Sequence, residues 1–257
     1  MIEANSFMKG RLLKAAFFSK LTSMRKLFDK SNFLYAFVTV VFTIITNQLV
    51  YQGSKLINLH FHIWDIAMPV DYTFRLVPWT IGIYVGSYVF WFVAYFIIAL
   101  QDDRKQCERF FAAALVAKAL CLVVFLVVPT GAALRPEEVV GTSFWAKLTR
   151  FIYSADSPAV NYFPSLHCLA SWLCFIGVRG KKEFPLAWRI ASFFLAVAVF
   201  VSTITTRQHV LIDIPGGIVF AELSWALSDF DAIRNAYARC INWIMAHIFR
   251  QKDFGDT

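Results

Sequence analysis

Long apolar runs separated by short polar stretches dominate this sequence. Six apolar segments can be marked, at about 33–50, 76–100, 110–129, 164–179, 184–204 and 209–228. Most of them approach the ~20 residues that a helix needs to cross the hydrocarbon core of a bilayer, although the fourth is short. None keeps an alternating apolar and polar pattern, which disfavours a β-barrel. The pattern therefore predicts an all-α integral membrane bundle of six transmembrane helices.

The composition supports a membrane protein and narrows its chemistry. Hydrophobic residues make up 58% of the chain, charged residues only 16%, and the mean hydropathy is +0.57. A soluble domain could not cover its surface with so few charges. The five cysteines are odd in number and show neither a disulfide framework nor a zinc-ligand spacing. We therefore expect no metal and no cofactor.

The charge distribution predicts how the chain is oriented. The net charge is +8, and most lysines and arginines lie before the first segment, between the second and third, between the fourth and fifth, and after the sixth. If six segments cross the membrane in alternation, all these places share one side, which the positive-inside rule assigns to the cytoplasm. We expect both termini in the cytoplasm and a multi-pass protein of the plasma (inner) membrane.

Three parts of the chain can be distinguished by this pattern. Residues 1–32 form a basic amphipathic N-terminal segment, 33–228 a membrane catalytic domain, and 229–257 an amphipathic cytoplasmic tail. Within the first and last parts, residues 7–28 and 230–249 place apolar side chains at helical spacing between basic ones. Both are expected to form helices at the surface of an anionic leaflet.

Two polar islands interrupt the apolar sequence, Phe163-Pro-Ser-Leu-His167 and Thr206-Arg-Gln-His-Val-Leu-Ile-Asp213. A bilayer makes ionisable groups costly, so residues of this kind inside or beside an apolar run need a reason. The predicted orientation brings four such residues to the outer, extracytoplasmic face: Arg135, His167, Arg207 and His209. Residues that share one face can form one site.

His209 and Asp213 form the first part of the candidate site. Four residues apart on a helix, they would share a face, and the carboxylate would accept a hydrogen bond from one imidazole nitrogen. This bond fixes the tautomer and leaves the other nitrogen free as a nucleophile. Taken alone, such a pair is more often a buried histidine satisfied by a nearby acid.

The second part of the site is the start of the fourth segment. Pro164 suits a first helical turn, Ser165 can cap it, and the exposed amides of a helix N-terminus attract anions. There His167 could protonate a leaving oxygen. The guanidinium groups of Arg135 and Arg207 are permanently charged, and their paired donors suit phosphate oxygens. Each residue alone could equally extend to lipid headgroups. Together these residues indicate phosphoryl transfer without a metal.

The same residues resemble the type 2 phosphatidic acid phosphatase superfamily, which includes inositol phosphorylceramide synthases and has sphingomyelin synthases as relatives. Its three motifs appear in order, with matches at Arg135-Pro136, at Pro164-Ser165 with His167, and at Ser202 with His209 and Asp213. The resemblance implies a six-span enzyme with an outward-facing site. It also implies a phosphohistidine at His209, orientation by Asp213, a proton from His167, and phosphate held by Arg135 and Ser165.

Three positions depart from the family motifs. Val128 stands at the first-motif lysine, Leu166 at the second-motif glycine, and Thr203 at the third-motif arginine. On a continued helix, positions 203 and 207 would share a face, so Arg207 is a candidate to replace the missing arginine. These departures resemble the inositol phosphorylceramide and sphingomyelin synthase branch.

Three functions remain open from the sequence. The first is a lipid phosphatase that cleaves a phosphomonoester or diphosphate at the outer leaflet, and the second is a phosphotransferase that passes a phospho-headgroup to a lipid alcohol. The third and most remote is a haem-binding or non-catalytic membrane protein, with His167 and His209 as axial ligands. The expected partners are a lipid phosphate or phospholipid substrate and membrane lipids, with no nucleic acid.

The sequence also allows predictions for a lysine within the third segment and for the first outer loop. Lys118, inside the third segment, either faces the bundle interior or extends to the membrane surface. A group of polar residues in the first outer loop is expected to be solvated: His60, His62, Asp65 and Asp71.

Overall fold

The computed structural model describes residues 30–101 and 103–249, and these are mostly helical. The helices are α2 (Lys30–Asn58), α3 (Ile81–Ala99), α4 (Arg104–Val127), α5 (Phe144–Ala155), α6 (Leu166–Val178), α7 (Leu186–Thr205), α8 (Asp213–Leu227) and α9 (Asp231–Phe249). Two short 3₁₀ helices, η1 (Pro69–Thr73) and η2 (Pro78–Thr80), precede α3. The predicted amphipathic helix over 7–28 lies outside the described residues.

Six helices correspond to the six predicted segments, and four of them are long and apolar enough to cross a membrane. These four are Ser31–Asn58, Pro78–Ala99, Arg104–Val127 and Leu186–Thr205. The other two, α6 and α8, have 13 and 15 residues and fall short of the ~20 residues of a full crossing. The all-α membrane architecture is thus confirmed in outline, with four candidate spans.

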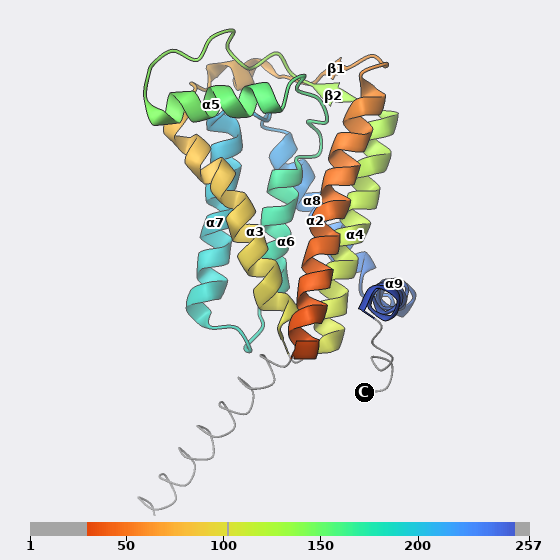
Figure 1. Ribbon diagram of the computed structural model, residues 1–257. Helices are drawn as coiled ribbons and strands as arrows, with labels where there is room; N and C mark the ends of the chain where they lie inside the picture. Colours follow the sequence, from red (N-terminus) through yellow and green to blue (C-terminus); the bar gives the residue numbers. More distant parts are fainter. Residues whose placement is uncertain (1–29, 102, 250–257) are drawn as a thin grey trace, which may run out of the picture.

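The two short helices occupy the middle of the bundle (Figure 1). Helix α6 packs against α3, α4, α7 and α8, and α8 also packs against α4. Glycine allows the closest of these approaches. A Cβ on Gly217 of α8 would lie 2.7 Å from the Cβ of Cys168 and 2.9 Å from the amide nitrogen of Leu169, both on α6. Small residues let helices in membranes approach in this way.

Helix α9 lies across the bundle axis, near the end where α2 begins (Figure 1). It packs against α2 and α4 through the buried side chains of Tyr237, Ile241 and Met245, while Trp243 and Ile248 are exposed. The predicted amphipathic helix at 230–249 is therefore present. Its buried side chains recur every four residues, and Ile248 is exposed near the end of the helix.

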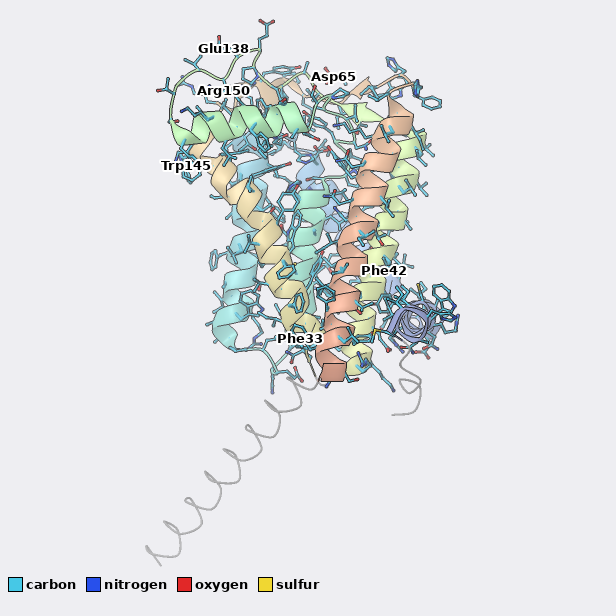
Figure 2. The ribbon with its side chains drawn as sticks, viewed as in Figure 1. Phe33, Phe42, Asp65, Glu138, Trp145 and Arg150 are labelled. Carbon is cyan, nitrogen blue, oxygen red and sulfur yellow. The ribbon has the colours of Figure 1, made fainter. Side chains whose placement is uncertain are left out.

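The opposite end of the bundle is covered by α5 and the long loops, which form a lid over the helix ends (Figure 1). Two-residue strands β1 (Trp64–Asp65) and β2 (Thr130–Gly131) pair in parallel and tie the two loops together. Helix α5 lies in a stretch expected to be a loop. Its start is held by Trp145, which packs on Gly82 of α3, and by Arg150, which donates to the carbonyls of Val139 and Gly141 (Figure 2).

Candidate active site

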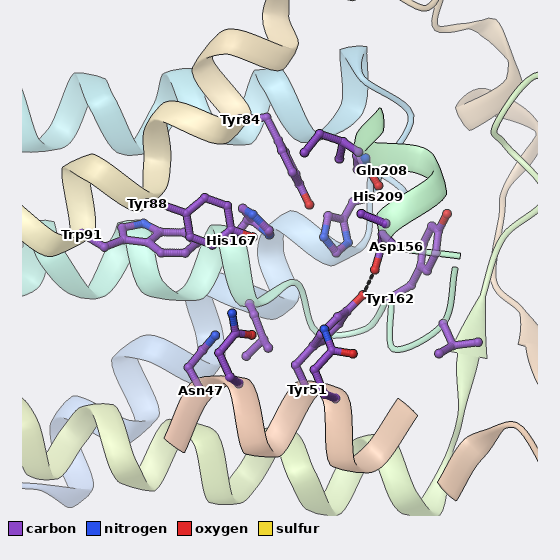
Figure 3. Close-up of a pocket in the computed structure, with 16 residues that line it drawn as sticks. Asn47, Tyr51, Tyr84, Tyr88, Trp91, Asp156, Tyr162, His167, Gln208 and His209 are labelled. Carbon is purple, nitrogen blue, oxygen red and sulfur yellow. Dashed lines mark hydrogen bonds between the residues drawn. The ribbon is translucent and has the colours of Figure 1, made fainter. Parts of the chain in front are cut away.

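A cavity of about 180 Å³ opens beneath this lid, between α2, α3, α6 and the loop that precedes α8. His167 and His209 both line it, with their ring centroids 6.0 Å apart (Figure 3). Side chains from α2 and α3 form the facing walls. The cavity therefore joins the two polar islands that are separate in the sequence.

The predicted contact between His209 and Asp213 is present, but a turn makes it rather than a helix. His209 Nδ1 lies 2.9 Å from Asp213 Oδ2, which also accepts the amide of Val210 at 3.1 Å. Helix α8 begins only at Asp213, so His209 precedes it. Asp213 is fully buried, and the backbone turn brings the two side chains together. The bond to Nδ1 leaves Nε2 of His209 available for chemistry.

A second acid, Asp71, holds the loop that carries His209. Its Oδ1 accepts the amide of Leu211 at 2.7 Å, and its Oδ2 accepts the amide of Met68 at 2.8 Å. Asp71 is 2% exposed. The expectation that it is solvated is wrong, because its carboxylate is buried and accepts these two backbone amides. His60, His62 and Asp65 are exposed, as expected.

His167 lies in the first turn of α6, as predicted. Ser165 is the N-cap, and its Oγ accepts the amide of Cys168 at 3.3 Å. Pro164 precedes the cap and is not part of the first turn, which corrects the prediction. Within the described chain, Nε2 of His167 is buried and has no hydrogen-bond partner. An unpaired buried nitrogen is costly, so it marks a place where a ligand can bind.

Aromatic side chains of α3 surround the His167 ring on its other sides. Tyr84 stacks on it with centroids 4.1 Å apart, and Trp91 and Tyr88 follow at 5.1 and 5.5 Å. These three residues were missed by the sequence interpretation. Their spacing of four and three residues along one helix was the available signal.

Arg135 is paired with an acid that the sequence interpretation also missed. Its Nη2 lies 2.5 Å from Asp156 Oδ2 and also donates to Oε1 of Gln208, the neighbour of His209. Asp156 Oδ1 accepts the hydroxyl of Tyr51 at 2.5 Å and lies 3.5 Å from Lys55 Nζ. The carboxylate of Asp156 lines the cavity, whereas Arg135 lies behind it.

The pKa values of Arg135 and Tyr162 determine the charges of these two side chains at pH 7. Burial lowers the pKa of Arg135, but Tyr162 and Asp156 outweigh burial and raise it, so this side chain stays protonated. Burial raises the pKa of Tyr162 to about 12, so its hydroxyl is neutral at pH 7. Tyr162 lines the cavity, its ring centroid lies 5.5 Å from that of His209, and its hydroxyl has no partner within the described residues.

Arg207 does not lie where a continued helix would place it. Helix α7 ends at Thr205, and Arg207 has a φ of +51°. Its guanidinium donates to three backbone carbonyls, those of Leu134, Tyr72 and Phe74. The prediction that positions 203 and 207 share a helix face is therefore wrong, because the helix ends between them. Arg207 links three loops of the lid, and its side chain is engaged by the backbone instead of facing the cavity.

Among residues 30–101 and 103–249, no group of three or more His, Cys, Asp or Glu side chains is arranged to hold a metal ion. Asp156 lines the cavity beside the histidine pair, together with aromatic side chains of α3.

Within a bundle of apolar helices, a histidine bonded to a buried acid thus lies across one cavity from a second histidine, and this arrangement is suited to phosphoester chemistry. The family model of the PAP2 superfamily matches residues 58–227, which run from the end of α2 to the end of α8. The chain belongs to the PAP2 superfamily, a family of phosphatases and phosphotransferases. No curated protein and no solved structure matches the chain.

Proposed function

We propose that this protein is a membrane lipid phosphatase that works through a phosphohistidine at His209 and acts on a lipid phosphomonoester or diphosphate. The observation that carries the proposal is the placement of His209, oriented by Asp213, 6.0 Å from His167 across one cavity. A phosphoryl group between the two rings would meet a nucleophile on one side and an acid on the other.

The first step forms the phosphoenzyme. Nε2 of His209 attacks phosphorus, the bond between phosphorus and the lipid oxygen breaks, and protonated His167 gives its proton to the leaving oxygen. Asp213 stabilises the positive charge that develops on the His209 ring. The step requires that His167 carry a proton before the attack.

The second step releases phosphate and restores the enzyme. Neutral His167 takes a proton from water, the water oxygen attacks phosphorus, and the bond from phosphorus to His209 breaks. The same groups serve both steps, because the base of the second is the acid of the first.

The phosphate oxygens would be held at the start of α6, with Arg135 contributing a positive charge from behind the cavity wall. The amides of Leu166 and His167 open the helix and have no acceptor within the described chain, while Ser165 fixes the turn as its cap. Free amides at a helix N-terminus bind phosphate. Arg135 keeps a positive charge next to Gln208, and the neutral hydroxyl of Tyr162 can donate. Arg207 would act indirectly, by holding the loop that carries His209.

For the whole molecule we propose six membrane-crossing helices within 33–228, both termini in the cytoplasm, and a site at the outer face of the plasma membrane. In this arrangement α6 and α8 are the two further membrane crossings beside the four longer helices. The loops next to α6 and α8 extend these short helices toward the membrane surfaces. Support comes from the charge distribution, since Arg104, Lys105, Lys181 and Lys182 lie at the ends of helices away from the histidines.

Hydrolysis is preferred over transfer because water is always available to a phosphohistidine, whereas transfer needs a second lipid in the cavity. The experiment is to incubate the purified protein with phosphatidic acid, a diacylglycerol diphosphate and a prenyl diphosphate, with and without diacylglycerol or ceramide. We expect free phosphate from at least one substrate and an acid-labile phosphoenzyme. A new headgroup lipid in place of phosphate would favour the phosphotransferase.

The first prediction concerns the nucleophile. His209→Ala should abolish both phosphate release and the phosphoenzyme, because no other imidazole is oriented by a buried acid at this cavity. His247→Ala is the matched control, since this exposed histidine of α9 lies outside the cavity. Full activity in His209→Ala would contradict the proposal.

Activity should also persist in a chelator, because the proposed steps use no metal ion. A loss of activity that added divalent metal restores would exclude the metal-free scheme.

A further inference from the structure

The site described above leaves one buried cation unexplained. Lys118 lies within α4, is 1% exposed, and its Nζ has no hydrogen-bond partner among the described residues. It faces the bundle interior, which decides between the two alternatives left by the sequence. Burial of an ammonium or amine without a partner is costly, because the group gives up its hydrogen bonds to water and gains none in return. Such a residue indicates a ligand that provides the missing hydrogen-bond acceptor.

Lys118 lines a second cavity, of about 260 Å³, which adjoins the histidine cavity. The two cavities share four lining residues, Asn47, Gln48, Tyr88 and Trp91. Trp91 and Tyr88 also contact the His167 ring. A molecule with its phosphate at His209 could therefore extend directly into the second cavity.

The walls of the second cavity are suited to a lipid. Apart from Lys118 and a few polar groups of α2, they consist of aromatic and aliphatic side chains. Ile44 of α2 and Phe92 of α3 line the cavity and are also exposed on the outside of the bundle, 39% and 46% respectively. The cavity is thus bordered by the surface that would meet membrane lipids, between α2 and α3.

The polar groups in this cavity are free to bind. The side-chain amides of Asn47 and Gln48 have no hydrogen-bond partner within residues 30–101 and 103–249, and both residues line the two cavities. A purely hydrocarbon tail would leave these amides and Lys118 unsatisfied. The complementary ligand carries acceptor oxygens between its phosphate and its hydrocarbon chains.

We propose that the second cavity binds the lipid backbone of the substrate, and that Lys118 donates a hydrogen bond to a carbonyl oxygen that joins a hydrocarbon chain to that backbone. The shared chemistry is an ester or an amide carbonyl, as in a diacylglycerol or an acylated sphingoid base. The proposal rests on the proposed function for the direction of the substrate. It goes further by naming the part of the lipid that Lys118 selects.

The experiment measures binding and does not require turnover. The full-length protein in detergent is titrated with phosphonate analogues of phosphatidic acid, which resist hydrolysis, bearing 14-carbon chains joined by ester, amide or ether bonds. We expect the analogues with carbonyl groups to bind about tenfold more tightly than the ether, as one added hydrogen bond to a charged donor implies. Comparison of ester with amide identifies the kind of backbone.

Variants test whether Lys118 causes the preference for analogues with carbonyl groups. Lys118→Met keeps the volume of the side chain and should bind all three analogues equally, while Lys147→Met, at an exposed lysine of α5, should keep the preference. A wild-type protein that binds the ether as tightly as the carbonyl analogues would overturn the proposal, and so would a preference that survives Lys118→Met. If the preference is found but no lipid phosphate is hydrolysed, the proposed function fails and the binding site stands.

Discussion

At the residue scale, the site depends on how one carboxylate is shared. Asp156 lies at the end of α5 and accepts from Tyr51 and Arg135 while it pairs with Lys55. Two of these partners are cations with side chains 8% and 13% exposed. Neither could remain buried without an anion nearby. Asp156 therefore sets the charge balance behind the cavity and joins α2, the loop between α4 and α5, and the end of α5.

Removing this acid should be strongly destabilising. Asp156→Ala leaves Lys55 and Arg135 buried without their anion, so we expect a loss of about 3–5 kcal/mol in the free energy of unfolding. Denaturation in detergent, followed by circular dichroism, measures this loss. Asp229→Ala is the matched control, because the pair of Asp229 with Arg109 is largely exposed and should contribute about 1 kcal/mol or less. Equal effects of the two variants would contradict this account.

At the element scale, the distance between α6 and α8 determines the geometry of the site. Helix α6 carries His167 in its first turn, and α8 begins with Asp213. The contact at Gly217 sets how closely these two helices lie near those residues. Short helices at the centre of the bundle thus position the acid and the orienting carboxylate, while the four longer helices surround them.

A single methyl group at this contact should separate the two helices. In Gly217→Ala the new Cβ would lie 3.0 Å from the carbonyl oxygen of Ser165 as well as against Cys168 and Leu169, and the backbone atoms cannot move aside cheaply. Because misplacement by about 1 Å can cost ~10²-fold in rate, we expect a loss of activity of at least tenfold. Phosphate release and the melting temperature together measure the effect.

The control for this prediction lies on α3. Gly86 has nothing within 4 Å of the position of an added Cβ, so Gly86→Ala should leave activity unchanged and slightly raise stability through helix propensity. A normal rate in Gly217→Ala would show that the close approach is not required for catalysis.

At the scale of the whole molecule, the proposed orientation can be tested by chemical labelling. Glu138 and Lys182 are both exposed and lie in loops on opposite sides of the proposed bundle. After replacement of the exposed Cys240, Glu138→Cys should react with a membrane-impermeant maleimide in intact cells. Lys182→Cys should react only after permeabilisation. The reverse pattern would place the site on the cytoplasmic face.

The sequence determined the class of the protein because its signals are local. Apolar length predicted the helices, and motif spacing identified His167, His209 and Asp213 before any contact was known. The contact between His209 and Asp213 was predicted for the wrong reason, since a turn and not a helix brings them together. Side chains four residues apart can meet in either conformation, so the spacing alone could not distinguish the two.

What only the tertiary structure decided involves contacts between residues far apart in the chain. Asp71 holds the loop of His209 across 140 positions, Asp156 reaches Tyr51 across 105, and Lys118 faces a cavity built largely from α2 and α3. No local period encodes such contacts. They arise because buried charges and amides must find partners wherever packing brings the helices together. The sequence therefore determined the family motifs, whereas the fold decided which distant residues hold the motif residues in place and which cavities adjoin them.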